Sequence, residues 1–198
     1  MIKLITKCED LVSLPGARLA FFAGSFNPIH CGHMKVAEFV LREYVDHVII
    51  GVHSHNAKKN LIPIQERLEL IIRLCSLSFF NSRICLIDPS FFNGIENRKF
   101  VGLARKLVNL GLEVFILKGQ DTLIRRGNYP LSEFPHLVHN RGGTERSLHG
   151  ILNGPIMRIK SISTMSSTKV RERLLAGKRV YPCDDIEDYI KGKQLYAR

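Results

Sequence analysis

The sequence contains neither a long apolar run nor a paired-cysteine motif. No stretch approaches the roughly 20 consecutive apolar residues that a membrane-spanning helix needs, so no membrane partner is expected. Residues 1–16 are interrupted by Lys7, Glu9 and Asp10, which excludes the continuous apolar centre of a signal peptide. The five cysteines are an odd number without a Cys-x-x-Cys pair, so neither a disulfide framework nor a zinc site is indicated. These absences favour the cytoplasm as the location.

Acidic residues are scarce relative to basic ones. The chain has 18 Asp and Glu against 29 Lys and Arg, which gives a net charge of +11 at pH 7. A basic chain attracts polyanions such as nucleic acid, an acidic membrane or a polyphosphate substrate. Its basic residues are spread along the sequence, which favours a cleft that binds phosphates over a nucleic-acid-binding arm. Nucleic acid is therefore not the expected partner.

The pattern of apolar residues predicts an α/β fold. A length of 198 residues, 45% of them hydrophobic, is enough for one domain with a core. Apolar and β-branched stretches predict strands at 19–23, 47–52, 83–87, 112–117, 136–139 and 155–160. The strand at 136–139 is expected at an edge, and amphipathic stretches between strands predict helices flanking a central parallel sheet. We expect residues 1–18 to be an N-terminal extension and residues 19–198 to be a single domain.

The strongest chemical signal lies in residues 19–35, LAFFAGSFNPIHCGHMK. An apolar strand runs into a turn marked by Gly24 and Pro28, and an amphipathic helix follows. A strand, a glycine turn and a helix N-terminus together hold phosphate, through backbone N–H groups and the helix dipole. His30 and His33 lie three residues apart on the first helical turn and can reach the same phosphate. The alternative is that these histidines only cap the helix.

The segment GSFNPIHCGH resembles the nucleotidyltransferase superfamily that carries a His-x-Gly-His signature. Its form is most similar to the nicotinate and nicotinamide mononucleotide adenylyltransferases, which implies a Rossmann-like fold. A second signature supports the resemblance, because residues 166–171 are similar to the family's Ser-Ser-Thr-x-x-Arg. There the hydroxyl and N–H groups hold ATP phosphates, and the arginine, here Arg171, adds a planar pair of donors. The alternative is a structural helix cap.

The string KKNLIPIQERLELI, residues 58–71, also resembles a family segment. In that segment a loop lysine and an arginine early in a helix contact the substrate phosphates. The resemblance implies these roles for Lys58, with Lys59 in reserve, and for Arg67. The same string is similar to the pantetheine-phosphate adenylyltransferases, so it does not separate the two branches.

Three weaker resemblances concern the rest of the site. Gly119 and Asp121 follow a strand and are similar to the family's Gly-x-Asp, whose aspartate lies near the dinucleotide; a helix cap is the alternative. Arg141 is similar to an arginine near the substrate. The family usually stacks an aromatic residue, often Trp, on the pyridine ring, but this chain has no Trp. Phe91 or Phe92 can replace it, and the choice between nicotinate and nicotinamide stays open.

The resemblance implies an enzyme that transfers AMP from ATP to nicotinate or nicotinamide mononucleotide, forming the dinucleotide of NAD biosynthesis and pyrophosphate. Mg²⁺ bound chiefly through ATP phosphates is the expected cofactor, with no metal ligands from the protein. Alternatives are adenylyl transfer to phosphopantetheine, or a non-catalytic nucleotide- or nucleic-acid-binding protein of the same fold; a homo-oligomer stays open. The predicted catalytic residues are His30, His33, Lys58 and Arg171, and the predicted substrate-binding residues are Gly24, Ser25, Phe26, Lys59, Arg67, Phe92, Gly119, Asp121, Arg141, Ser166, Ser167 and Thr168.

Overall fold

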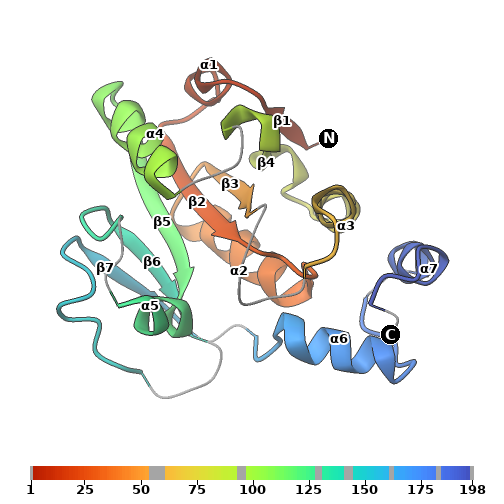
Figure 1. The fold of residues 1–198 in the computed structure, drawn as a ribbon. Helices are drawn as coiled ribbons and strands as arrows, with labels where there is room; N and C mark the ends of the chain where they lie inside the picture. The colour runs from red at the N-terminus through yellow and green to blue at the C-terminus, as the bar shows by residue number, and fades with distance from the viewer. Residues whose placement is uncertain are drawn as a thin grey trace.

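A central parallel sheet organises the chain (Figure 1). The structure is a computed structural model that describes residues 2–53, 61–92, 97–127, 131–140, 145–160, 163–181 and 184–196. Within these residues, seven strands pair in the order β1-β4-β3-β2-β5-β6-β7, and every pair is parallel. They are β1 (Lys3–Ile5), β2 (Arg18–Gly24), β3 (His47–Val52), β4 (Ile84–Ile87), β5 (Glu113–Gly119), β6 (His136–His139) and β7 (Ile156–Ile159). The predicted α/β fold is confirmed.

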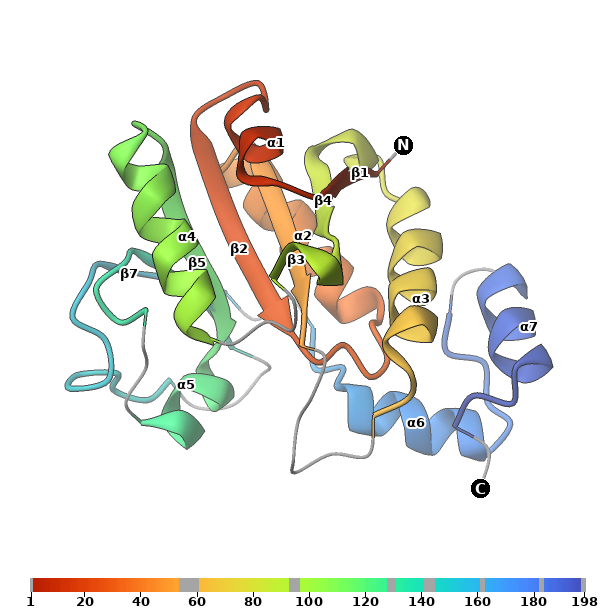
Figure 2. The same cartoon turned by 45° about the horizontal axis from the view of Figure 1, so that its top comes forward.

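Helices cover both faces of the sheet (Figure 2). The α-helices are α1 (Cys8–Val12), α2 (Cys31–Glu43), α3 (Ile64–Ser76), α4 (Asn97–Asn109), α5 (Gln120–Arg126), α6 (Ser167–Leu175) and α7 (Asp184–Gly192). Two 3₁₀ turns, η1 (Asn81–Arg83) and η2 (Pro89–Phe92), flank β4. One face of the sheet packs with α2, α3, α6 and α7, and the other with α1, α4 and α5. No helix in the described ranges is both long and apolar enough to span a membrane.

Strand β2 shows why its sequence is a continuous apolar run. Ala20 and Phe22 are buried in the cluster that contains α2. Leu19 and Phe21 are buried in the cluster that contains α4. Because a central strand of a parallel sheet is covered on both faces, successive residues are all apolar.

The two edges of the sheet differ from the sequence-based expectation. Lys3–Ile5, within the predicted extension, forms β1 and pairs with β4. The prediction that 136–139 is an edge strand is wrong, because β6 lies between β5 and β7. Both histidines of this strand are buried, and Nδ1 of His136 forms a hydrogen bond with the carbonyl oxygen of Phe134 at 2.7 Å.

The strand order places a ligand-binding edge next to β2. On one side of β2 lie β3, β4 and β1, and on the other lie β5, β6 and β7. The order from β4 to β7 is that of the Rossmann fold, in which ligands bind at the carboxyl ends of the strands where the order reverses. The register brings the ends of these strands together at Gly24, Val52, Gly119 and His139.

Burial of His136 predicts a pH dependence of stability. Desolvation lowers the pKa of this imidazole to about 4, against about 6.5 in an unfolded chain. The neutral His136 ring therefore contributes its full stabilisation of the folded state above about pH 6.5, and this stabilisation is lost as the pH falls towards 4. The full difference is on the order of 3 kcal/mol. Urea unfolding at pH 7 and pH 4.5 measures most of it.

Two variants make this measurement specific. His136→Gln removes the titrating group, so its free energy of unfolding should fall less between the two pH values than that of the wild type. His149→Gln changes an exposed histidine and should retain the wild-type loss. Equal losses in the wild type and His136→Gln would contradict the assignment.

Candidate active site

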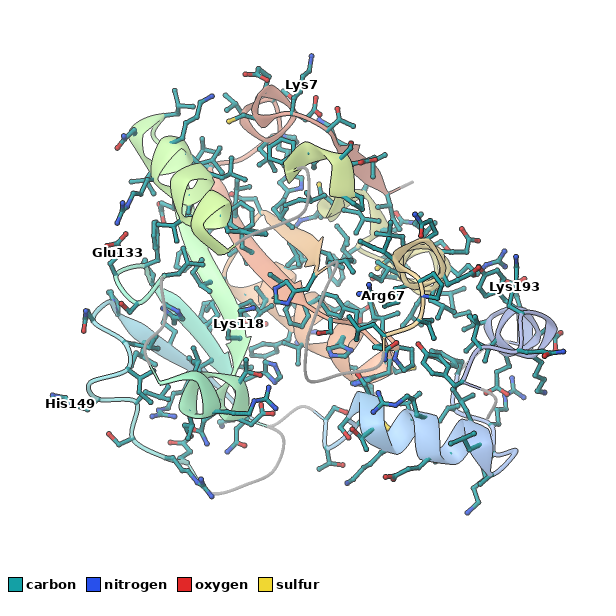
Figure 3. All side chains as sticks on the ribbon, viewed as in Figure 1. Lys7, Arg67, Lys118, Glu133, His149 and Lys193 are labelled. Atoms are coloured by element: carbon teal, nitrogen blue, oxygen red, sulfur yellow. The ribbon has the colours of Figure 1, made fainter. Side chains whose placement is uncertain are left out.

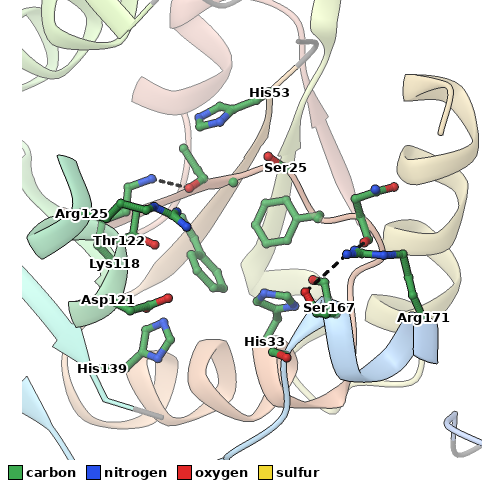
Figure 4. Close-up of a pocket in the computed structure, with 18 residues that line it drawn as sticks. Ser25, His33, His53, Lys118, Asp121, Thr122, Arg125, His139, Ser167 and Arg171 are labelled. Carbon is green, nitrogen blue, oxygen red and sulfur yellow. Dashed lines mark hydrogen bonds between the residues drawn. The ribbon is translucent and has the colours of Figure 1, made fainter. Parts of the chain in front are cut away.

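A cavity of about 350 Å³ opens at the carboxyl ends of β2 and β5 (Figure 4). The loop after β2, the start of α2, the helix α5 and the start of α6 contribute its walls. The predicted residues that line it are Gly24, Ser25, Phe26, His33, Gly119, Asp121, Ser166, Ser167, Thr168 and Arg171. The two signatures and the Gly-x-Asp segment, far apart in sequence, thus share one cavity.

Other predicted residues do not line the cavity or lie outside the described part of the chain. His30 is 3% exposed and Arg67 is 1% exposed, and neither is among the lining residues. Phe92 ends η2, and its side chain is outside the described part. Lys58, Lys59 and Arg141 also fall outside it.

The two histidines of the signature cap α2 and pack against each other. Nδ1 of His30 accepts the N–H of Gly32 at 3.1 Å, and Nδ1 of His33 accepts the N–H of His30 at 3.3 Å. Their ring centroids lie 3.8 Å apart. A side chain at Gly32 would bring its Cβ within 3.0 Å of the His30 ring, so glycine is required there. Both histidines therefore cap the helix, and this cap leaves the predicted contact of His33 with phosphate as a prediction.

Capping also fixes which nitrogen of each neutral ring carries the proton. A backbone N–H only donates, so each Nδ1 must accept and the neutral ring carries its proton on Nε2. His33 lines the cavity. It is therefore a suitable hydrogen-bond donor for a phosphate oxygen while it serves as part of the cap.

Arg67 anchors the loop after β2 from inside the protein. Its Nη1 donates to the carbonyl oxygens of Ser25 at 2.9 Å and His53 at 2.7 Å, and its Nε donates to Ile62 at 3.0 Å. Burial lowers the pKa of the guanidinium. Figure 3 shows Arg67 in the interior, between the sheet and α3.

The C-terminal part of the chain engages three successive carbonyl groups farther along the same loop. Arg171 Nη1 donates to Asn27 at 2.5 Å, Ser167 Oγ to Pro28 at 2.9 Å and the Tyr181 hydroxyl to Ile29 at 2.6 Å. Carbonyl oxygens repel phosphate, so their pairing with protein donors favours an anion at this loop.

Phe26 has a strained backbone between these anchored carbonyl groups. Its φ of +42° lies in the left-handed region, which bulky residues rarely adopt. The ring packs edge-on against Phe22 at 5.3 Å and His33 at 5.1 Å. Strain of this kind persists where the surroundings hold it and is common at functional sites.

The sequence analysis missed eight lining residues: Phe22, Ala23, Asn27, His53, Lys118, Thr122, Arg125 and His139. Some of them had a usable signal. His53 follows β3, Lys118 precedes the last residue of β5, and His139 ends β6. Polar residues at the carboxyl ends of predicted parallel strands are candidates for a site. Nothing comparable marked Thr122 and Arg125.

The charge of the lining residues favours an anionic ligand. Lys118, Arg125 and Arg171 are cations, and Asp121 is the single carboxylate among the described residues that line the cavity. The starts of α5 and α6 add helix N-termini, which attract negative charge. In the described part of the chain, no group of three His, Cys, Asp or Glu side chains could hold a metal ion.

Comparison with known proteins agrees with this arrangement. A family model described as cytidylyltransferase-like matches residues 21–173. The chain is 28% identical to a probable nicotinate-nucleotide adenylyltransferase of Thermoanaerobacter sp. (strain X514), over 91% of this chain and 95% of that protein. It is 31% identical to a nicotinamide-nucleotide adenylyltransferase of Pyrococcus abyssi (strain GE5 / Orsay), over 86% and 81%.

The fold is also similar to that of a solved structure. The Plasmodium falciparum nicotinic acid mononucleotide adenylyltransferase complexed with NaAD has a TM-score of 0.75 to this chain. The match covers 91% of this chain and 97% of that one. At 16% identity, this likeness concerns the fold.

The contacts of Arg67 predict a large loss of stability when they are removed. Arg67→Met keeps the stem but loses three charge-assisted hydrogen bonds, so the free energy of unfolding should fall by about 3 kcal/mol. Arg67→Lys keeps the charge without the planar donor group, so its free energy of unfolding should lie between those of the wild type and Arg67→Met. Urea unfolding measures both.

The matched control is Arg42→Met, which removes an arginine that is 61% exposed and paired with Glu43. Its effect should stay within about 0.5 kcal/mol, because exposed ion pairs contribute little. If Arg67→Met were as stable as Arg42→Met, the anchoring role of Arg67 would be wrong.

Proposed function

The chain belongs to the cytidylyltransferase-like family, and we propose that it transfers AMP from ATP to nicotinate or nicotinamide mononucleotide, forming the dinucleotide of NAD biosynthesis and pyrophosphate. One observation carries the proposal: the two signatures form one wall. Ser167 bonds Pro28, 139 positions away, and Arg171 bonds Asn27, 144 positions away. The names of both relatives support the acceptor class.

The reaction needs alignment and positive charge more than it needs a protein nucleophile. A phosphate oxygen of the mononucleotide attacks the α-phosphorus of ATP, and the bond to pyrophosphate breaks. The attacking oxygen is already anionic, so catalysis consists of positioning and of stabilising the charge that develops on the leaving group. We propose that Nε2 of His33, the hydroxyl groups of Ser166 and Thr168 and the Arg171 guanidinium perform these tasks. The Ser167 hydroxyl donates its single proton to Pro28 and so holds the loop beside them.

The remaining predicted residues keep defined roles in this proposal. Lys58, with Lys59 in reserve, and Arg141 supply further positive charge, and Phe92 or Phe91 stacks on the pyridine ring. Arg67 acts indirectly, because its guanidinium holds the loop that binds phosphate. His30 caps α2 and orients His33.

Mg²⁺ would enter with ATP. The cavity suits an ion held chiefly by the triphosphate, since Asp121 is its single described carboxylate and the described residues contain no three-ligand cluster. When bound, the ion neutralises phosphate charge. The protein's own donors hold and orient the phosphates.

The test is product formation with ATP and each acceptor. We expect dinucleotide and pyrophosphate with nicotinate or nicotinamide mononucleotide, and neither product with phosphopantetheine. Turnover with phosphopantetheine alone would transfer the assignment to the other branch. ATP binding without turnover on any acceptor would favour a non-catalytic nucleotide-binding protein.

His33 should contribute mainly to the transition state. His33→Ala should lower kcat on the order of 10²–10³-fold with little change in either KM, because a preorganised donor to developing charge is lost. His33→Asn keeps an N–H donor and should restore part of the rate. Single-turnover rates measure this, and melting curves control for the loss of the cap. A folded, ATP-binding His33→Ala enzyme with normal turnover would contradict this role.

Arg171 should contribute mainly to ATP binding. Arg171→Ala removes a charge-assisted contact worth roughly 1.5–3 kcal/mol, so the KM for ATP should rise more than kcat falls. Arg173→Ala, two positions along α6 and outside the lining residues, is the control. An unchanged KM for ATP together with a lower melting temperature would make Arg171 purely structural.

A further inference from the structure

Lys118 places a positive charge on the wall of the cavity opposite the second signature, against the carbonyl group that precedes Gly24 of the first. The residues of β5 alternate between faces, and Val114 and Ile116 pack in the cluster that contains α4. Lys118 continues this series, is 5% exposed, and donates from Nζ to the carbonyl oxygen of Ala23. Figure 4 shows it on the opposite side of the cavity from Ser167 and Arg171.

The surroundings of Lys118 are apolar on the side away from the phosphate end. Lys118 and His53 border both the cavity and a small adjoining space. That space is lined by four residues of the α4-side cluster: Phe21, Phe100, Ile116 and Leu131. An ammonium group therefore lies at the edge of an apolar wall.

A predicted stacking residue lies on this same side. Phe91 packs against the α4-side cluster, but it is not among the residues that line the cavity or the adjoining space. His33 and the second signature belong to the opposite, α2 and α6 side. A bound mononucleotide would therefore direct its phosphate to His33 and Arg171, and its base towards Lys118 and the apolar wall beside it.

We propose that Lys118 selects the acceptor by a carboxylate on its pyridine ring, so that this enzyme uses nicotinate mononucleotide in preference to nicotinamide mononucleotide. The inference rests on the proposed function. An ammonium group forms a charge-assisted hydrogen bond with a carboxylate. A neutral carboxamide offers one acceptor oxygen, and its NH₂ group cannot accept from the lysine. The same wall therefore favours the anionic ring over the neutral one.

The experiment compares kcat/KM for the two mononucleotides at saturating ATP. The wild type should favour nicotinate mononucleotide. Lys118→Met keeps the apolar stem and should lower kcat/KM for this acceptor by on the order of 10–100-fold. It should change the value for nicotinamide mononucleotide and the KM for ATP little. Lys118→Arg should restore part of the preference.

Two controls make the outcome decisive. Lys106→Met removes the same charge from the exposed side of α4 and should leave the ratio unchanged. If Lys118→Met does not fold, Lys118→Gln and direct binding of each mononucleotide to the wild type by calorimetry replace it. Dinucleotide formation without a nicotinate preference, or an equal loss for both acceptors in the variant, would overturn the inference alone. Turnover of neither mononucleotide would overturn the proposed function, and the inference with it.

Discussion

The buried guanidinium of Arg67 sets the geometry on which the site depends. It joins three segments: the loop after β2 through Ser25, the end of β3 through His53, and the residues before α3 through Ile62. Burying a charge is costly unless it is fully hydrogen-bonded. Because the guanidinium offers donors in one plane, it fixes these carbonyl groups relative to one another. The hydrogen bonds of Arg67 therefore restrain the loop after β2 relative to the end of β3 and the start of α3.

The other half of the loop is held by the end of the chain. Donors from Ser167, Arg171 and Tyr181 engage three successive carbonyl groups, from Asn27 to Ile29. These contacts join segments more than 130 positions apart, so the site forms only when the C-terminal helices pack beside α2. Arg171 faces the cavity from the same position. The conformation of the second signature is thus coupled to that of the first.

Local sequence signals explain what could be predicted. Strand β3 lies at the predicted residues 47–52, and β2 extends the predicted 19–23 by one residue at each end, because apolar, β-branched runs identify buried strands. Both signatures combine a turn, a cap and a helix start, which are local features. Strand β1 and the interior position of β6 depend on pairing with distant segments. The carbonyl contacts of Arg67 and the position of Lys118 likewise follow from the assembled sheet.

The cavity crosses the edge of the sheet, and its two sides have different chemical constraints. On the α2 and α6 side, helix N-termini, paired carbonyl groups and a strained backbone at Phe26 form the proposed phosphate site, so a substitution there disturbs several contacts at once. On the α4 side, Lys118 of β5 supplies charge next to an apolar wall, and Arg125 of α5 lines the cavity beside it. Under the role proposed for Lys118, acceptor choice changes through side chains on this side while the α2 and α6 side stays intact. In the relatives, one name specifies nicotinate and the other nicotinamide, and this separation of the two sides provides a physical route between such preferences.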